Sequence, residues 1–173
     1  MSVYALGDRI PRIAEGAYIH PEAVIIGNVT VEEKSTVWPS AVLRGDYGAI
    51  VIGAGTSIQD GAVIHATEED ATVIGDDCVI GHLAHLEGCE VRSGALVGSG
   101  AIVLARAVIA EGALVAAAAL VGEGVAVPRD SVAIGVPARI RPISDAARGL
   151  VPRYADLYVC NGMRYAEELR RIQ

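Results

Sequence analysis

Aliphatic residues recur along this chain at every sixth position, in four series separated by short irregular segments. The members are Ile13, Ile19, Ile25, Val31, Val37 and Leu43; Ile52, Ile58 and Ile64; Ile74, Ile80 and Leu86; and Val91, Val97, Val103, Ile109, Val115, Val121 and Val127. Between the series the count slips by three residues, then by four, and finally loses one. A period of six matches neither the 3.6-residue repeat of a helix nor the simple alternation of one amphipathic strand.

The six-residue period predicts a parallel β-solenoid. Each hexapeptide forms one short strand and a turn, three hexapeptides form a triangular coil of about 18 residues, and coils stack about 4.8 Å apart. The aliphatic residue fills the inside of each face, and small residues, which usually stand four positions later, fit the second inward position and the corners. A β-sandwich would instead show turn signals at a spacing of about 8–12 residues and no fixed period. We therefore expect an all-β solenoid domain over residues 1–137.

The period stops at about Pro137, and the last part of the chain is predicted to be helical. Residues 144–173 carry an apolar stripe at helical spacing, with Pro152 suited to a first turn and a break expected at Asn161-Gly162. The stripe consists of Leu150, Tyr154, Leu157, Tyr158, Tyr165, Leu169 and Ile172. We expect residues 138–173 to form a helical segment that packs along one face of the solenoid.

Composition fits a narrow solenoid and excludes several classes of protein. Of the 173 residues 52% are hydrophobic, yet only 4% are aromatic, none is Phe and 20 are Gly, so the core must be aliphatic. The longest uncharged stretches run for 13 residues, which is short of the roughly 18 that a membrane span requires. A net charge of −7 argues against nucleic acid and anionic membranes as partners. The three cysteines show no metal-ligand spacing, and an odd number fits a reducing compartment, so we expect a cytoplasmic protein.

Candidate chemistry lies where the six-residue count fails, because a solenoid is a scaffold and its departures are places for a site. His65 and Glu87 each follow an inward aliphatic residue by one position, so both project outward. Their separation of 22 equals one coil of about 18 plus the four-residue insertion, so they should stack on one edge in neighbouring coils. His82 sits at a corner. The segments concerned are 38–46 (WPSAVLRGD), 58–65 (IQDGAVIH), 68–70 (EED) and 81–89 (GHLAHLEGC).

With these segments in this order, the chain resembles the gamma-class carbonic anhydrase family of left-handed β-helix trimers over nearly its whole length. The resemblance implies a left-handed solenoid, a homotrimer, and a zinc ion at each subunit interface that activates water to attack carbon dioxide. It places His65 and His82 at two metal-ligand positions. At each site, the neighbouring subunit would contribute His82. The small-molecule substrate pair would be carbon dioxide and bicarbonate.

The third metal ligand departs from the family pattern. The family has a histidine at the position of Glu87, whereas this chain offers Glu87 and, two residues earlier, His85. Either side chain can complete the set, and two His with one carboxylate suit Zn²⁺ and also Fe²⁺. An anionic ligand makes the metal a weaker Lewis acid and slows hydration. The alternative is that metal binding has been lost and that His85 and Glu87 form an ordinary surface pair.

The resemblance also assigns roles to residues around the metal. Gln59 matches the glutamine that orients the metal-bound hydroxide, Arg44 matches an arginine near the site, and Glu68 stands where some members carry a proton shuttle. Arg44 with Asp46 and Asp60 is an expected interface network, and a purely structural salt-bridge role for these three is the alternative. For Glu68 the alternative is simple solvation of an exposed acidic loop.

Three functions are compatible with these residues. The main hypothesis is reversible hydration of carbon dioxide. The first alternative is an acyl-CoA thioesterase or transferase that uses the groove between subunits of the same scaffold. The second is a non-catalytic trimeric scaffold protein that has lost a competent metal site.

Overall fold

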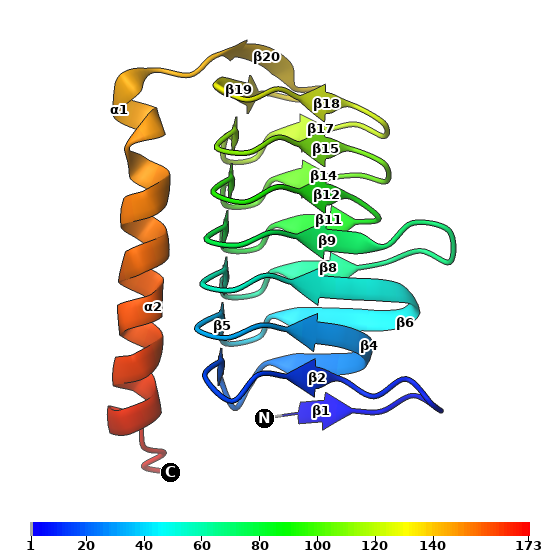
Figure 1. The fold of residues 1–173 in the computed structure, drawn as a ribbon, viewed down its shortest axis with the longest axis vertical. Coiled ribbons are helices and arrows are strands. Elements are labelled where there is room, and N and C mark those ends of the chain that lie inside the picture. Colours follow the sequence, from blue (N-terminus) through cyan, green and yellow to red (C-terminus); the bar gives the residue numbers. More distant parts are fainter. Residues whose placement is uncertain (1) are drawn as a thin grey trace.

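The computed structural model describes residues 2–173 and shows a three-sided parallel solenoid with a long helix lying along one side (Figure 1). One sheet of 12 strands wraps around two sides, and a second sheet of eight strands forms the third. The 12 strands are β1 (Ser2–Tyr4), β2 (Arg12–Ile13), β4 (Val24–Val31), β6 (Val42–Ile52), β8 (Val63–His65), β9 (Thr72–Ile74), β11 (His85–Glu87), β12 (Glu90–Val91), β14 (Ile102–Val103), β15 (Val108–Ile109), β17 (Leu120–Val121) and β18 (Ala126–Val127). The eight are β3 (Tyr18–Ile19), β5 (Thr36–Val37), β7 (Ser57–Ile58), β10 (Val79–Ile80), β13 (Leu96–Val97), β16 (Leu114–Val115), β19 (Ser131–Ile134) and β20 (Arg139–Pro142).

The strand register confirms the irregular steps that the sequence predicted. Leu96 pairs with Leu114, so a regular step from one coil to the next is 114 − 96 = 18. Thr36 pairs with Ser57, a step of 57 − 36 = 21, and Ser57 pairs with Val79, a step of 79 − 57 = 22. Val79 then pairs with Leu96, a step of 96 − 79 = 17. The insertions of three and four residues and the single loss are therefore absorbed within individual coils, and the parallel stacking continues through them.

The predicted inward positions form continuous columns of buried side chains. One column contains Ile25, Leu43, Ile64, Leu86, Val103 and Val121, which are register partners in successive coils and are fully buried. Small residues fill the second inward position, and these include Ala23, Ala41, Ala62, Ala84, Ala101 and Ala119. An aliphatic residue and an alanine at each step fill the narrow prism, and this is why the chain needs hardly any aromatic residue in its core.

The C-terminal part differs from the prediction in two ways. Strand β20 runs antiparallel to β19 and therefore extends the sheet into residues that were expected to be helical. Helix α1 (Asp145–Arg148) begins after Ser144, whose side chain caps it, and helix α2 (Leu150–Glu168) follows. Helix α2 is continuous through Gly162, so the break expected there was wrong. A Cβ atom at Gly162 would lie 2.6 Å from Cγ2 of Thr36, so this glycine lets the helix approach the sheet closely.

An aromatic cluster fixes helix α2 on the eight-stranded sheet, where it packs against β3, β5, β7 and β10. The ring centroid of Trp38, the only tryptophan, lies 5.0 Å from the ring centroid of Tyr165 and 5.8 Å from that of Tyr158. Its Nε1 donates to Thr36 Oγ1 at 2.9 Å and to Ser57 Oγ at 3.1 Å. The position of Trp38, and with it that of the helix, is therefore set by neighbouring coils of the solenoid. Within residues 2–173, neither helix is long and apolar enough to cross a membrane.

Candidate functional site

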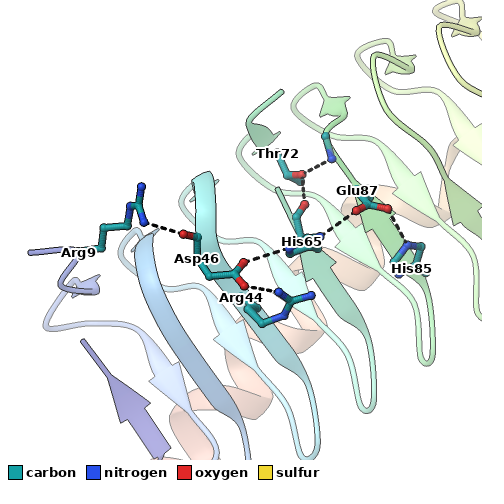
Figure 2. A network of polar contacts seen from close by, with 8 residues as sticks. Arg9, Arg44, Asp46, His65, Thr72, His85 and Glu87 are labelled. Carbon is teal, nitrogen blue, oxygen red and sulfur yellow. Dashed lines mark hydrogen bonds and ion pairs between the residues drawn. The ribbon is translucent and has the colours of Figure 1, made fainter. Parts of the chain in front are cut away.

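Three of the predicted site residues lie in one outward-facing ladder on β6, β8 and β11. Arg44 is the register partner of His65, and His65 is the register partner of Glu87. The stacking of His65 and Glu87 in neighbouring coils, predicted from their spacing, is therefore confirmed (Figure 2).

Both ring nitrogens of His65 face carboxylates. Nδ1 lies 2.8 Å from Oε1 of Glu87, and Nε2 lies 3.0 Å from Oδ1 of Asp46. The other carboxylate oxygen of Asp46 accepts from Arg44, and Arg9 Nη1 donates to the Asp46 carbonyl oxygen at 2.7 Å. Carboxylate oxygens therefore face both ring nitrogens of His65, and His65 offers no free nitrogen.

The pKa values of both carboxylates around His65 are lowered. Hydrogen bonding to His65 lowers the pKa of Glu87, against the opposing effect of burial. For Asp46, burial acts in the raising direction, but hydrogen bonds from Arg44 and His65 outweigh it and lower the pKa. Both groups are therefore anionic at neutral pH and compete with any metal ion for the imidazole.

His85 lies at the end of the ladder, where its Nε2 is 3.6 Å from Oε2 of Glu87, within ion-pair distance but beyond hydrogen-bond distance (Figure 2). Its register partners are Val63 and Ile102. His85 and Glu87 therefore stand on either side of inward-facing Leu86, as their spacing predicted.

His82 lies apart from this ladder, in a second group at the corner between β10 and β11. Its Nδ1 is 2.8 Å from Oδ2 of Asp60, and about half of each side chain is exposed. The backbone N–H of His82 donates to Oε1 of Gln59 at 3.1 Å, and the Gln59 residue is only 4% exposed. No hydrogen bond joins Nε2 of His82 to another residue of the described chain, so this nitrogen is available to a substrate.

Within one chain the predicted metal ligands are thus divided between two groups. Among residues 2–173, no three His, Cys, Asp or Glu side chains come together in a way that could hold a metal ion. A metal site built from a single copy does not fit these residues. Zinc or iron binding stays a prediction that requires His82 of a second copy.

Two other predicted roles have local alternatives in the structure. Arg44 pairs with Asp46 and Asp60 pairs with His82, so within one chain the expected three-residue network is split. Glu68 is exposed on the loop that protrudes between β8 and β9 (Figure 1). In the same loop, Asp70 is held to the solenoid by Arg106, whose Nη1 donates to Oδ2 of Asp70 at 3.1 Å.

A cavity adjoins His82, between its corner and helix α2. Its volume is 300 Å³, and Gln59, His82, Tyr154 and Tyr158 contribute polar groups to its wall. Tyr154 and Tyr158 were predicted to lie on the apolar stripe of the helix, and their hydroxyl groups were not predicted to be part of a site. Their spacing of four residues, which puts two phenols on one helical face, was the available signal.

An exposed aliphatic strip runs along the same face as the ladder, on the side that helix α2 leaves uncovered. Its members are register partners in successive coils and are partly or fully exposed: Val24, Val42, Val63, Ile102 and Leu120, with His85 between Val63 and Ile102. An exposed apolar strip of this kind is a candidate surface for contact with another protein.

The architecture is that of a hexapeptide-repeat solenoid. No family model matches the sequence. The carnitine operon protein CaiE of Shigella flexneri and that of Escherichia coli O157:H7 are each 40% identical to this chain over 146 residues, which cover 84% of this chain and 74% of CaiE. Two solved structures are 33% identical: a Bacillus cereus protein described as a putative acetyltransferase, with a TM-score of 0.92, and a hexapeptide transferase family protein from Anaplasma phagocytophilum, with a TM-score of 0.91. They cover 95% of this chain, and the alignments span 96% and 98% of their own chains.

The chain therefore belongs to the hexapeptide-repeat transferase family of left-handed β-helix proteins, together with CaiE. These structures confirm the expected left-handed parallel β-helix with a C-terminal helix. The narrower resemblance to gamma-class carbonic anhydrases is not shown by them. The descriptions of these two structures name transferases.

Proposed function

We propose that this protein is an acyltransferase that uses an acyl-coenzyme A thioester, with His82 as the general base. The observation that supports this most directly is the contact between His82 Nδ1 and Asp60, which leaves Nε2 free beside a cavity. A carboxylate on one ring nitrogen fixes the tautomer and orientation of a histidine whose other nitrogen takes a proton. His65 is the poorer base, because carboxylates occupy both of its nitrogens.

The proposed reaction needs no group beyond the thioester and an acceptor. Nε2 of His82 removes the proton from an acceptor hydroxyl or amine, and the acceptor atom attacks the thioester carbonyl carbon. The carbon–sulfur bond then breaks, and the imidazolium returns the proton to the departing thiolate, which leaves as coenzyme A. Water in place of the acceptor turns the same step into thioester hydrolysis.

The exposed aliphatic strip supports a homotrimer. In a closed ring of three copies, the strip of each copy is covered by a second, complementary surface of the next copy. The corner that carries His82 lies between β10 and β11, and β11 is a strand of this face. A groove between copies would therefore adjoin His82 and give the thioester a place to bind.

The wild-type protein tests this function directly. We expect acetyl-coenzyme A to bind by titration calorimetry and to be hydrolysed faster than in buffer, with free coenzyme A separated by chromatography. A thiol dye is unsuitable, because Cys160 is exposed and would react with it. Absence of both binding and release of coenzyme A, in protein that elutes as a trimer, would contradict the proposal.

A second candidate function is metal-dependent hydration of carbon dioxide at the trimer interface. The register pairing of His65 with Glu87 favours it, because two ligands from one chain have to lie side by side in neighbouring coils. His82 of a neighbouring copy would be the third ligand. The two functions compete for His82, so bound metal distinguishes them.

Replacing Glu87 by His is expected to strengthen zinc binding by about tenfold or more, because it adds an imidazole ligand and frees Nδ1 of His65. Zinc per chain, measured by elemental analysis after dialysis, checks this. Glu87→Gln is the matched control, since it releases His65 without supplying a strong ligand. Equal zinc content in the two variants would rule out an interfacial site at this position.

A further inference from the structure

We propose that the cavity between helix α2 and the His82 corner binds the acceptor of the acyl group, and that this acceptor is a small polar molecule without negative charge. The proposal rests on the acyl transfer proposed above and adds the acceptor's binding site and chemical class. The cavity volume of 300 Å³ is at the lower end of the range for small-molecule sites. His82 is part of the wall, so an acceptor in the cavity lies beside the proposed base.

Polar groups without protein partners converge on this cavity. Gln59 is 4% exposed, and its Oε1 accepts from the backbone of His82. In residues 2–173, no hydrogen bond engages the Gln59 Nε2 group or the hydroxyls of Tyr154 and Tyr158. Nε2 of Gln59 is accessible to water, so a ligand in the cavity replaces water as its hydrogen-bond partner. A ligand with several hydroxyl or amine groups would satisfy all three side chains.

The cavity wall is held in place before a ligand arrives. The Tyr158 ring packs edge-on against Trp38, whose Nε1 is hydrogen bonded to Thr36 and Ser57. The apolar side chains of Val79 and Leu96, which are register partners, line the solenoid side of the cavity. A site whose groups are already positioned loses little ordering entropy on binding, so these hydroxyls can distinguish between ligands.

Charge decides the class of acceptor. None of the residues that line the cavity is Lys, Arg, Asp or Glu, and the carboxylate of Asp60 is paired with the lining residue His82. Burial, with a contribution from the Asp60 charge, raises the pKa of Tyr158, so its hydroxyl stays a neutral donor. A carboxylate or phosphate in the cavity would face the negative charge of Asp60, and no Lys or Arg side chain in the wall would offset it. Neutral and cationic acceptors avoid this repulsion.

Three sugars of similar size and different charge test the site: glucose, glucosamine and glucuronate. Trp38 is the only tryptophan and touches Tyr158, so its fluorescence reports binding without turnover. We expect a saturable change with glucose or glucosamine and none with glucuronate. Tyr158→Phe, which removes only the hydroxyl, is expected to weaken the binding by about three- to tenfold.

Tyr165→Phe is the matched control, because Tyr165 touches Trp38 but does not line the cavity. Equal weakening by the two variants, or no saturable change with any sugar, or equal binding of glucuronate would overturn the proposal. Coenzyme A release separates it from the proposed function. If the protein binds a sugar but never releases coenzyme A, the binding site is supported and acyl transfer is refuted. If it releases coenzyme A but Tyr158→Phe leaves the KM for the acceptor unchanged, only the binding site is refuted.

Discussion

Replacing His82 by alanine is expected to lower the rate of coenzyme A release from acetyl-coenzyme A by about 10²- to 10⁴-fold, the usual contribution of a general base. The fall should appear mainly in kcat, since the imidazole takes the proton in the transition state and its ring contributes little to thioester binding. Steady-state rates with chromatographic measurement of coenzyme A check the expectation. The histidine side chain is half exposed and outside the aliphatic core, so its removal should leave the fold intact.

Two further variants show whether the loss belongs to this histidine and its partner. Asp60→Asn keeps the shape of the pair but removes the charge that orients the ring, so we expect a smaller fall in kcat than for His82→Ala. His20→Ala removes a histidine from the first coil, where Nδ1 accepts from the backbone of Glu22, and should leave the rate unchanged. If His65→Ala reduces kcat as strongly as His82→Ala in correctly folded protein, the base lies in the ladder and our assignment is wrong.

The sequence was sufficient for the solenoid because one physical requirement repeats in it. Each coil has to place an aliphatic side chain inside a narrow prism, so the spacing of those residues reads out the strand register, including its irregular steps. The same count placed His65 beside Glu87, since their separation of 87 − 65 = 22 equals the observed step across the four-residue insertion. Backbone periodicity therefore predicts which residues share a ladder.

The hydrogen-bond partners of the site side chains could not be predicted from the six-residue period. Asp46 follows Arg44 by two residues on β6, near an irregularity in the pairing of β4 with β6. The sequence placed it in an interface network, whereas the structure turns it to the second nitrogen of His65. That contact depends on how β6 bends between the part that pairs with β8 and the part that pairs with β9, and no period in the sequence encodes the bend.

Tertiary packing also explains the errors in the C-terminal part. Asn-Gly is typical of a helix break, but in the structure Gly162 lies where helix α2 meets Thr36 and has no room for a Cβ atom. The cavity beside His82 was missed for a related reason. It exists only after the helix docks on the sheet, so the solenoid repeat and the helical stripe, taken separately, do not indicate it.

Replacing Leu86 by alanine is expected to lower the free energy of unfolding by about 2 to 5 kcal/mol. Leu86 is fully buried between Ile64 and Val103 in the neighbouring coils. The strands above and below hold the backbone at a fixed spacing, so the space left by the leucine cannot close and the contacts with both neighbours are lost. Urea unfolding followed by circular dichroism at one fixed protein concentration checks this, since the stability of an oligomer depends on concentration.

Leu83→Ala is the matched control in the same coil. Leu83 is 72% exposed at the corner, so the same chemical change there removes little buried surface and should alter stability by no more than about 0.5 kcal/mol. Leu83 already has a positive φ of 59°, and alanine at that position meets the same backbone strain as leucine. A large difference between the two variants would show that stability comes from the inward ladder. Similar losses would mean that the outer surface of the corner contributes as much, as it would if a neighbouring copy covered it.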